Sequence, residues 1–341
     1  MSSSGRPSGP PSSRLFRPTK LGRWDVLAKI AGGGISSIYL GRASDAEDRV
    51  ALKVVKPELR GNATVDHMFV DEASLLVKLA HPNIVRTYEF GTEEPHGRFI
   101  AMELLLGKTM AAVTDGCAQR GARLAPEAVA WIGVHVADAL HYAHEMVDPE
   151  RGHLQIIHRD VNPANLFLTF EGNVKLFDFG MARATGRASK SSPGIVKGTL
   201  PYLSPEQVMQ LPIDRRTDVF GLGTTLWELA TGKRLFKRDT DAETVRAVQF
   251  ATIADPRSIA PEVPEALVAI IKRALERNRE HRYPTAAALR DDLDAFVRPR
   301  QADQVAARLS RLLDELFPGE RKRQMGWLKP AVAGGSIPPR R

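Results

Sequence analysis

The sequence predicts an α+β fold with two lobes, a small β-rich lobe followed by a larger helical lobe. Residues 24–106 contain short runs rich in β-branched and aromatic residues, which are typical of strands. After Gly107 the apolar residues recur at helical spacing, as they do in residues 126–145. The length of 341 residues suits a two-lobed domain of about 270 residues with tails. We therefore expect a cleft between the two lobes.

The individual elements follow from the same periodicities. One helix interrupts the strands of the small lobe at 65–79 and ends at His81-Pro82, because proline disfavours helix at the residue before it. In the large lobe Pro126 occupies a suitable first position for a helix. The expected strands are 24–30, 37–40, 50–55, 84–90 and 99–103, and the further helices are 204–210, 216–231, 241–250, 264–277 and 284–297.

Composition excludes several classes of protein. The single cysteine, Cys117, rules out an intramolecular disulfide and is most simply a small apolar filler. Residues 1–11 are rich in Ser, Gly and Pro and lack the apolar core of a signal peptide. The most apolar stretch, 99–106, is far shorter than the roughly 18 residues of a membrane span. We therefore expect a cytoplasmic protein without a membrane span.

The net charge of +8 is located in the two ends of the chain. Residues 1–20 carry +4 and residues 318–341 carry +5, so residues 21–317 carry about −1. Basic segments rich in Pro and Gly are typical of disordered tails. Such tails attract polyanions non-specifically, but a near-neutral body does not favour specific nucleic-acid binding.

Two short segments carry the strongest functional signal. They read HRDVNPAN at 158–165 and DFG at 178–180, and Asp178 lies thirteen positions after Asn165. Between them, 166–168 and 174–177 have the composition of strands, and 171–173 of a turn. The resulting hairpin would bring the two segments together around one phosphate.

In this order and at this distance, the two segments resemble the catalytic and metal-binding loops of protein kinases. From about Trp24 to Phe296 the chain resembles the bacterial serine/threonine kinases of eukaryotic type, the Hanks-type family. The resemblance implies a protein kinase-like fold and transfer of the ATP γ-phosphoryl group to serine or threonine hydroxyls of proteins, including the chain itself. It also implies that Asp160 accepts the hydroxyl proton and that Asn165 and Asp178 bind Mg²⁺, or Mn²⁺ in its place.

The nucleotide site implied by the resemblance lies mainly in the small lobe. Residues 30–38 resemble the glycine-rich loop that closes over the triphosphate, with Ala31 and Ser36 at the usual first and third glycine positions. Met102 resembles the gatekeeper that precedes the hinge. The implied nucleotide-binding residues are Ile30, Ala31, Gly32, Gly33, Gly34, Ile35, Ser36, Ser37, Ile38, Ala51, Lys53, Met102, Glu103, Leu104 and Phe167.

Lys53 resembles the lysine that holds the α- and β-phosphates. An ammonium group in an apolar strand needs a counter-charge, because burying it unpaired is costly. Glu72 matches the helix glutamate that provides this charge in the family. Asp71 is the rival, but it lies about 100° round the helix, so only one of the two faces the cleft. The apolar residues that follow favour Glu72.

The resemblance also assigns structural and regulatory residues. Residues 198–206 resemble the end of an activation segment, and Glu206 would form a buried ion pair with Arg282. Asp218 would cap the backbone of the catalytic loop. Arg159 is the family's usual receptor for a phosphate on the activation loop. The candidate phosphorylation sites are Thr185, Ser189, Ser191, Ser192 and Thr199.

Asn162 departs from the family pattern, which places a lysine two residues after the catalytic aspartate. Loss of that cation should lower the rate without abolishing it, and it weakens the assignment to serine and threonine. Asn162 is also the only support for a pseudokinase that acts as a scaffold or nucleotide-sensing module. The intact Lys53, Glu72 and Asp160 oppose that alternative. A small-molecule phosphotransferase is disfavoured by the peptide-binding segment 198–206.

The predicted domain limits are a kinase domain at 21–298, with lobes at about 21–106 and 107–298, and disordered tails at 1–20 and 318–341. An amphipathic helix is expected within 299–317, where one stripe is apolar. This helix either packs on the large lobe or binds a partner protein. The stripe consists of Val305, Leu309, Leu312, Leu313 and Leu316.

Overall fold

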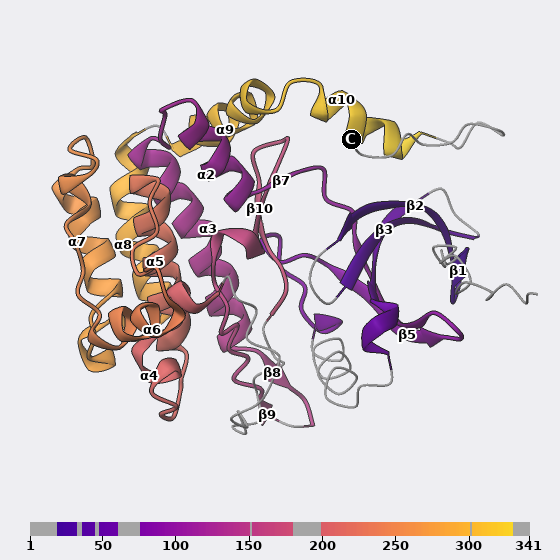
Figure 1. Ribbon diagram of the computed structural model, residues 1–341, viewed down its shortest axis with the longest axis horizontal. Coiled ribbons are helices and arrows are strands. Elements are labelled where there is room, and N and C mark those ends of the chain that lie inside the picture. The colour runs from indigo at the N-terminus through magenta and orange to yellow at the C-terminus, as the bar shows by residue number, and fades with distance from the viewer. Residues whose placement is uncertain are drawn as a thin grey trace, which may run out of the picture.

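The two predicted lobes are both present. The computed structural model describes residues 19–32, 36–44, 48–60, 76–150, 152–179, 199–300 and 302–329. Figure 1 shows a sheet on one side of the molecule and a group of helices on the other. This arrangement confirms the predicted α+β architecture.

The small lobe is a six-stranded antiparallel sheet with the order β1-β2-β3-β4-β6-β5. Successive side chains of a strand point to opposite faces. In β4 this places Leu52 and Val54 in the small-lobe core, and Ala51 and Lys53 on the opposite face. The strands are β1 (Lys20–Leu21), β2 (Trp24–Gly32), β3 (Ser36–Ala43), β4 (Arg49–Val55), β5 (Thr87–Glu93) and β6 (Gly97–Glu103).

The predicted strand 84–90 differs from the observed one. β5 begins at Thr87, because Ile84 forms a bridge with Leu176 of the large lobe instead. The N–H of Val85 donates to the carbonyl of Leu176 over 3.0 Å. The first residues of the apolar run 84–90 therefore pair with the large-lobe hairpin, and the later residues pair within the small-lobe sheet. Sequence periodicity alone does not show where the change between the two sheets occurs. The predicted helix 65–79 lies almost entirely outside the described residues.

The large lobe is organised around α3 (Pro126–His144), which packs against α5 and α8. The predicted apolar face of α3 is buried in the largest core cluster. Two predicted strands form the hairpin of β10 (Leu166–Thr169) and β11 (Val174–Leu176), beside β7 (Gly107–Thr109). The other helices are α2 (Met110–Gln119), α4 (Pro205–Val208), α5 (Arg216–Thr231), α6 (Asp241–Phe250), α7 (Glu265–Ala274) and α8 (Ala286–Val297), and a further hairpin joins β8 (Val147–Asp148) to β9 (Gly152–His153).

The predicted amphipathic helix is α9 (Ala302–Leu316), and it packs on the large lobe. Val305, Leu309 and Leu313 are each at most 1% exposed. The approach is close, because a Cβ added to Gly172 in the β10–β11 turn would lie 2.1 Å from the carbonyl oxygen of Ala306. Of the two alternatives for this helix, the structure shows packing on the large lobe of the same chain.

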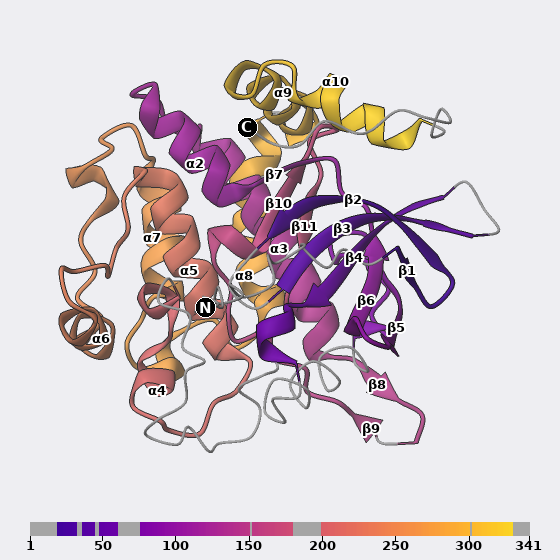
Figure 2. The same cartoon turned by 45° about the vertical axis from the view of Figure 1, so that its right-hand side comes forward.

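The prediction of a disordered tail from residue 318 is wrong for residues 318–329. This segment contains α10 (Glu320–Met325) and a 3-10 turn at Gly326–Leu328. Figures 1 and 2 show α9 and α10 running from the helical lobe toward the six-stranded sheet. The reason is a set of specific polar contacts, described below, that charge counting does not detect. Lys20 likewise belongs to β1 rather than to the predicted N-terminal tail.

A search of the described helices finds none with both the length and the apolar character that a membrane-spanning helix requires.

Candidate active site

The carboxylate of Asp160 is held by two asparagine side chains of its own loop. Asn162 Nδ2 donates to Asp160 Oδ1 over 2.9 Å, and Asn165 Nδ2 donates to Asp160 Oδ2 over 3.1 Å. Asn162 Oδ1 accepts from the N–H of Ala164 and caps the 3-10 turn Pro163–Asn165. A carboxylate oxygen can accept more than one hydrogen bond. The loop therefore presents an oriented proton acceptor.

Asp218 of α5 fixes the backbone of the same loop. Its carboxylate accepts from the N–H of His158 at 2.8 Å and from the N–H of Arg159 at 2.7 Å. The buried ring of His144 forms a third hydrogen bond at 2.7 Å. Burial alone would raise the pKa of Asp218, but these hydrogen bonds hold the pKa below its ordinary value. Asp218 therefore remains a carboxylate that can brace the loop.

Each of the two catalytic segments contains a residue with a strained backbone. Arg159 has a φ of 67° and Asp178 a φ of 56°, in the left-handed region that non-glycine residues rarely adopt. Such conformations persist only where the surroundings enforce them. At Arg159 the enforcing contact is Asp218. The geometry next to Asp160 thus depends on a buried carboxylate of the central helix.

His158 connects the catalytic segment to the DFG segment. Its Nδ1 accepts from the N–H of Asp160 at 3.3 Å, so the proton of the neutral ring lies on Nε2, 3.2 Å from the carbonyl of Phe177. Burial lowers the pKa of His158, which agrees with a neutral ring. The ring also packs on Phe179, with centroids 4.5 Å apart. The two segments therefore form one packed unit.

Lys53 reaches the DFG segment from the small lobe. Its Nζ lies 2.7 Å from Asp178 Oδ1, and the lysine side chain is 13% exposed. The predicted partner Glu72 lies outside the described residues. Asn165 uses its Nδ2 on Asp160, so its Oδ1 is the atom that can bind a cation. Together with the carboxylate of Asp178 this is a set of hard oxygen donors, which suits Mg²⁺.

Strand register brings several of the predicted nucleotide residues to one face of the small-lobe sheet. Paired residues of antiparallel strands share a face. Ile38 pairs with Lys53, and Ala51 pairs with Met102. Ala31 pairs with Ile38 and joins the same face. This is the face of β4 opposite the small-lobe core.

The other predicted nucleotide residues are distributed around this face. Ile30, Gly32, Ser36 and Ser37 lie on β2 and β3, on either side of residues 33–35. Phe167 is on β10 of the large lobe, and Leu104 follows the end of β6. Glu103 ends β6, where Lys175 Nζ lies 2.8 Å from its Oε1 and Arg86 N donates to its Oε2.

Of the candidate phosphorylation sites, Thr199 lies within the described residues. Thr199 precedes the 3-10 turn Leu200–Tyr202 and its carbonyl accepts from the N–H of Tyr202. The predicted residues that lie outside the described part of the chain are Gly33, Gly34, Ile35, Glu72, Thr185, Ser189, Ser191 and Ser192.

The family model described as "Protein kinase domain" matches residues 24–293. The chain belongs to the protein kinase family. The predicted resemblance to bacterial kinases of eukaryotic type is thereby confirmed, and so is the predicted fold.

Bacterial kinases are among its relatives. The chain is 36% identical over 303 residues to the tyrosine-protein kinase MasK of Myxococcus xanthus, covering 88% of this chain and 47% of that protein. It is 35% identical over 277 residues to the serine/threonine-protein kinase PknB of Mycolicibacterium smegmatis, covering 78% and 42%. The chain thus spans about half or less of the length of these relatives.

A solved kinase domain supports the same fold. The crystal structure of the Mycobacterium tuberculosis PknI kinase domain matches with a TM-score of 0.61 and 26% identity. The match covers 81% of this chain and 97% of that domain.

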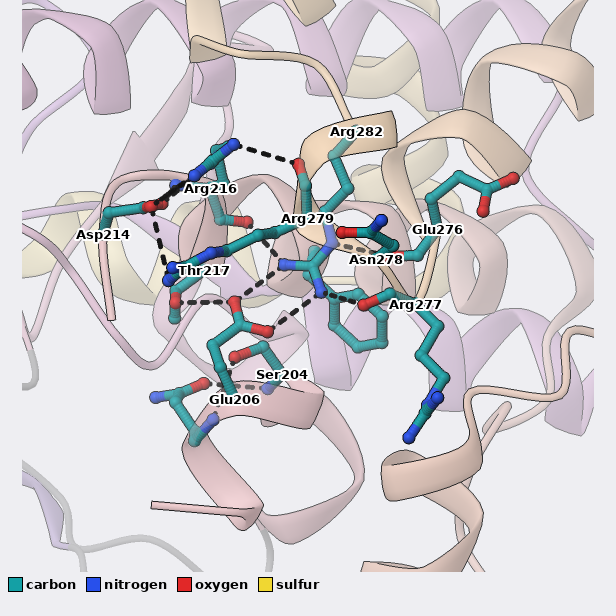
Figure 3. Close-up of polar contacts among 12 residues, drawn as sticks. Ser204, Glu206, Asp214, Arg216, Thr217, Glu276, Arg277, Asn278, Arg279 and Arg282 are labelled. Atoms are coloured by element: carbon teal, nitrogen blue, oxygen red, sulfur yellow. Dashed lines mark hydrogen bonds and ion pairs between the residues drawn. The ribbon is translucent and has the colours of Figure 1, made fainter. Parts of the chain in front are cut away.

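The kinase domain also contains the ion pair expected between Glu206 and Arg282. Figure 3 shows the two groups side by side, with Arg282 Nη1 2.7 Å from Glu206 Oε1 and Nη2 2.9 Å from Oε2. Thr217 Oγ1 donates to Glu206 Oε1 over 2.9 Å. Burial opposes ionisation of Glu206, but Arg282 outweighs it and holds the pKa below its ordinary value. The pair joins α4 to the segment before α8.

Sequence reasoning missed three residues that support the site. His144 braces Asp218, and Gln207 Nε2 donates to the carbonyl of Arg159 over 2.9 Å. Gln324 contacts the backbone after the hinge. His144 continues the stripe of Val136 and Leu140 at four-residue spacing, so a histidine on a buried face was a usable signal. Gln207 also completes a capping box with Ser204, a local pattern that marks the helix start but does not indicate the bond to Arg159. Gln324 makes two long-range hydrogen bonds to Gly107 that no local pattern indicates.

Proposed function

We propose that this chain is an ATP- and Mg²⁺-dependent protein kinase that phosphorylates serine or threonine hydroxyls. The observation that carries the proposal is the pair of hydrogen bonds from Asn162 and Asn165 to the Asp160 carboxylate. A carboxylate held at both oxygens next to the Lys53–Asp178 pair suits proton acceptance during phosphoryl transfer. A pseudokinase would have no need for this arrangement, which weighs against the scaffold alternative.

The residues of the chain have separate roles in the proposed reaction. The substrate hydroxyl oxygen attacks the γ-phosphorus, the bond to the β–γ bridging oxygen breaks, and ADP leaves. Asp160 orients the hydroxyl and receives its proton. Lys53 binds the α- and β-phosphates. Asn165 and Asp178 would hold Mg²⁺, which would supply positive charge that offsets the charge of the phosphates.

Asn162 changes this reaction relative to kinases that have lysine at its position. Its amide is used on Asp160 and on the 3-10 turn, and its side chain is buried. Asn162 therefore orients the catalytic carboxylate rather than adding a cation beside the γ-phosphate. This supports the expectation of a lower but measurable rate.

A tyrosine hydroxyl is the second candidate acceptor. Two observations favour it: a relative at 36% identity is named a tyrosine-protein kinase, and Asn162 replaces the lysine typical of serine/threonine kinases. Relatives named serine/threonine-protein kinases, such as PknB and the Streptomyces coelicolor PksC at 34% identity, support the first candidate.

Phosphoamino-acid analysis of the product distinguishes the two acceptors. The purified chain should label itself and a generic protein substrate with γ-labelled ATP and Mg²⁺, and acid hydrolysis should release phosphoserine or phosphothreonine. Lys53→Met should remove most of the label. Recovery of phosphotyrosine alone would replace the proposed acceptor, and equal labelling of wild type and Lys53→Met would contradict the enzyme itself.

Phosphorylation of the activation segment is expected to raise activity through Arg159. Burial lowers the pKa of the Arg159 guanidinium, so a phosphate dianion close by would compensate for its desolvation. Mass spectrometry after incubation with ATP should find phosphate on at least one of the predicted sites in 180–199. Treatment with phosphatase should lower the rate, and an equally fast dephosphorylated enzyme would refute this role.

The cellular context is proposed on sequence grounds. The lone cysteine, Cys117, is buried and reduced, which suits a cytoplasmic signalling enzyme. Protein substrates are the expected partners, and the near-neutral body supports no specific nucleic-acid ligand. The parts of the predicted basic tails at 1–18 and 330–341 lie outside the described residues.

A further inference from the structure

The segment after α9 runs from the large lobe, past the hinge, to the small lobe. It comprises residues 317–329 and is called the strap here. In Figure 2 α10 lies beside β7 and close to the strands of the small lobe. Its polar contacts fall into three groups, one for each part of the kinase domain that it passes. Nothing in the proposed reaction accounts for these contacts.

The first group attaches the strap to the large lobe. Arg321 Nη2 donates to the carbonyl of Phe170 over 2.7 Å, and its Nε lies 2.8 Å from Asp314 Oδ1. Glu320 Oε2 lies 2.8 Å from Lys108 Nζ, and both side chains are less than a quarter exposed. The Glu320 carboxyl accepts from Arg323 and Lys108, which lowers its pKa to about 2. The start of α10 is therefore fixed on the large lobe.

The second group is a double hydrogen bond to the backbone after the hinge. Gly107 N donates to Gln324 Oε1 over 2.8 Å, and Gln324 Nε2 donates to the Gly107 carbonyl over 3.1 Å. Gln324 is 4% exposed. β7 is the edge of its three-stranded sheet, so the glutamine amide takes the place of a neighbouring strand. Gly107 is required there, because a Cβ would lie 2.0 Å from the carbonyl oxygen of Leu168.

The third group reaches the small lobe. Arg49 Nε donates to the carbonyl of Trp327 over 3.1 Å, and its Nη2 donates to the carbonyl of Lys329 over 2.9 Å. Arg49 is the first residue of β4, the strand that carries Ala51 and Lys53. One segment thus contacts the large lobe, the end of the hinge and the strand that holds the nucleotide-binding lysine.

We propose that Gln324 is a positioning residue for the nucleotide, and that Arg49 acts with it through the strap. Gln324 fixes the position of Gly107, where the connection from Glu103 to β7 ends. Arg49 fixes the orientation of β4 relative to that connection. A binding site that is already ordered loses less entropy when the ligand binds. The strap therefore raises affinity for adenine nucleotides. This inference rests on the proposed function for its kinetic consequences only.

Gln324→Met is the test variant, because it keeps the volume of the side chain and removes both hydrogen bonds. The Kd for a fluorescent ADP analogue and the KM for ATP should rise about three- to tenfold. This is the change in affinity that the loss of one or two hydrogen bonds typically causes. The kcat and the KM for the protein substrate should stay within about twofold. Gln304→Met is the matched control, because Gln304 is exposed on α9 and should change nothing.

A double-mutant cycle with Arg49→Met tests whether the two residues act together. Residues of one network give non-additive effects. The double variant should therefore weaken nucleotide binding by less than the product of the two single effects. If the two single effects multiply in the double variant, Gln324 and Arg49 act independently, and the proposal that they act together through the strap is contradicted. Thermal unfolding of each variant identifies any general loss of folding, which would lower kcat and both affinities together and would also contradict a positioning role.

The binding measurement separates this inference from the proposed function. If wild type binds the ADP analogue through Gln324 but transfers no phosphoryl group, the proposed function fails and the strap remains. If wild type transfers phosphoryl groups and Gln324→Met binds nucleotide within twofold of it, the strap fails alone. A wild type that binds no adenine nucleotide would refute both.

Discussion

Replacing Asp160 with asparagine should lower kcat by about 10²- to 10⁴-fold, the usual contribution of a positioned general base. The amide cannot accept the hydroxyl proton. Its NH₂ group would also face Asn162 Nδ2 or Asn165 Nδ2, both of which are donors directed at the carboxylate. The variant therefore loses both the base and its orientation, although its shape is unchanged.

Nucleotide binding and transfer should separate in this variant. Asp160 contacts its own loop rather than the small-lobe face with Ala51 and Lys53, so the Kd for ADP should change less than twofold. Asp239→Asn, at an exposed loop position, is the matched control and should keep full activity. Retention of more than a tenth of wild-type kcat by Asp160→Asn would exclude Asp160 as the base.

Removing Arg282 should produce the largest loss of stability. Its guanidinium is 0% exposed, and its Nε and Nη2 also donate to the carbonyls of Glu276 and Arg277. Arg282→Met would leave the Glu206 carboxylate buried without its partner. Breaking such a pair costs about 3–5 kcal/mol, and chemical denaturation should show a decrease of that size in the free energy of unfolding.

Two further variants establish that the cost arises from the unpaired charge. Arg279→Met removes a partly exposed arginine that lies 3.6 Å from Asp214, and it should cost about 1 kcal/mol or less. Glu206→Met combined with Arg282→Met should recover much of the loss, because no charge then remains buried. A single Arg282→Met variant as stable as Arg279→Met would contradict this account of the pair.

The pH dependence of stability follows from the same pair. Because Arg282 depresses the pKa of Glu206, the stabilisation is present above the ordinary glutamate pKa of 4.5. It is lost as the pH falls through the lower pKa of the folded state. Wild type should therefore lose more stability than the double Met variant when the pH falls below about 4.5.

The sequence was most informative where function requires particular residues in a fixed order. Asp160, Asn165 and Asp178 were predicted as a group, because the hairpin between them fixes their spacing. Helices α3 to α8 of the large lobe were predicted, whereas α2 was not. Glu206 and Arg282 lie far apart in the sequence and were paired only through the family resemblance.

Other features depended on contacts that no local pattern encodes. Ile84 continues an apolar run but pairs with Leu176 of another sheet. Asn162 was interpreted as the loss of a cation, whereas its amide contacts Asp160 and Ala164. The strap was interpreted as a tail because its composition is basic. Contacts of Glu320, Arg321 and Gln324 with the large lobe, and of Arg49 of β4 with the backbone at Trp327 and Lys329, order it.

Parallel labelling with γ-labelled and α-labelled ATP is the most direct test of the central claim that this chain is a protein kinase. Purified wild type and Asp160→Asn would be incubated with Mg²⁺ and a generic protein substrate, and covalent label would be counted. We predict that wild type incorporates the γ-label and not the α-label, and that Asp160→Asn incorporates almost none of either. Incorporation of neither label by wild type, or of the α-label alone, would contradict phosphoryl transfer by this active site.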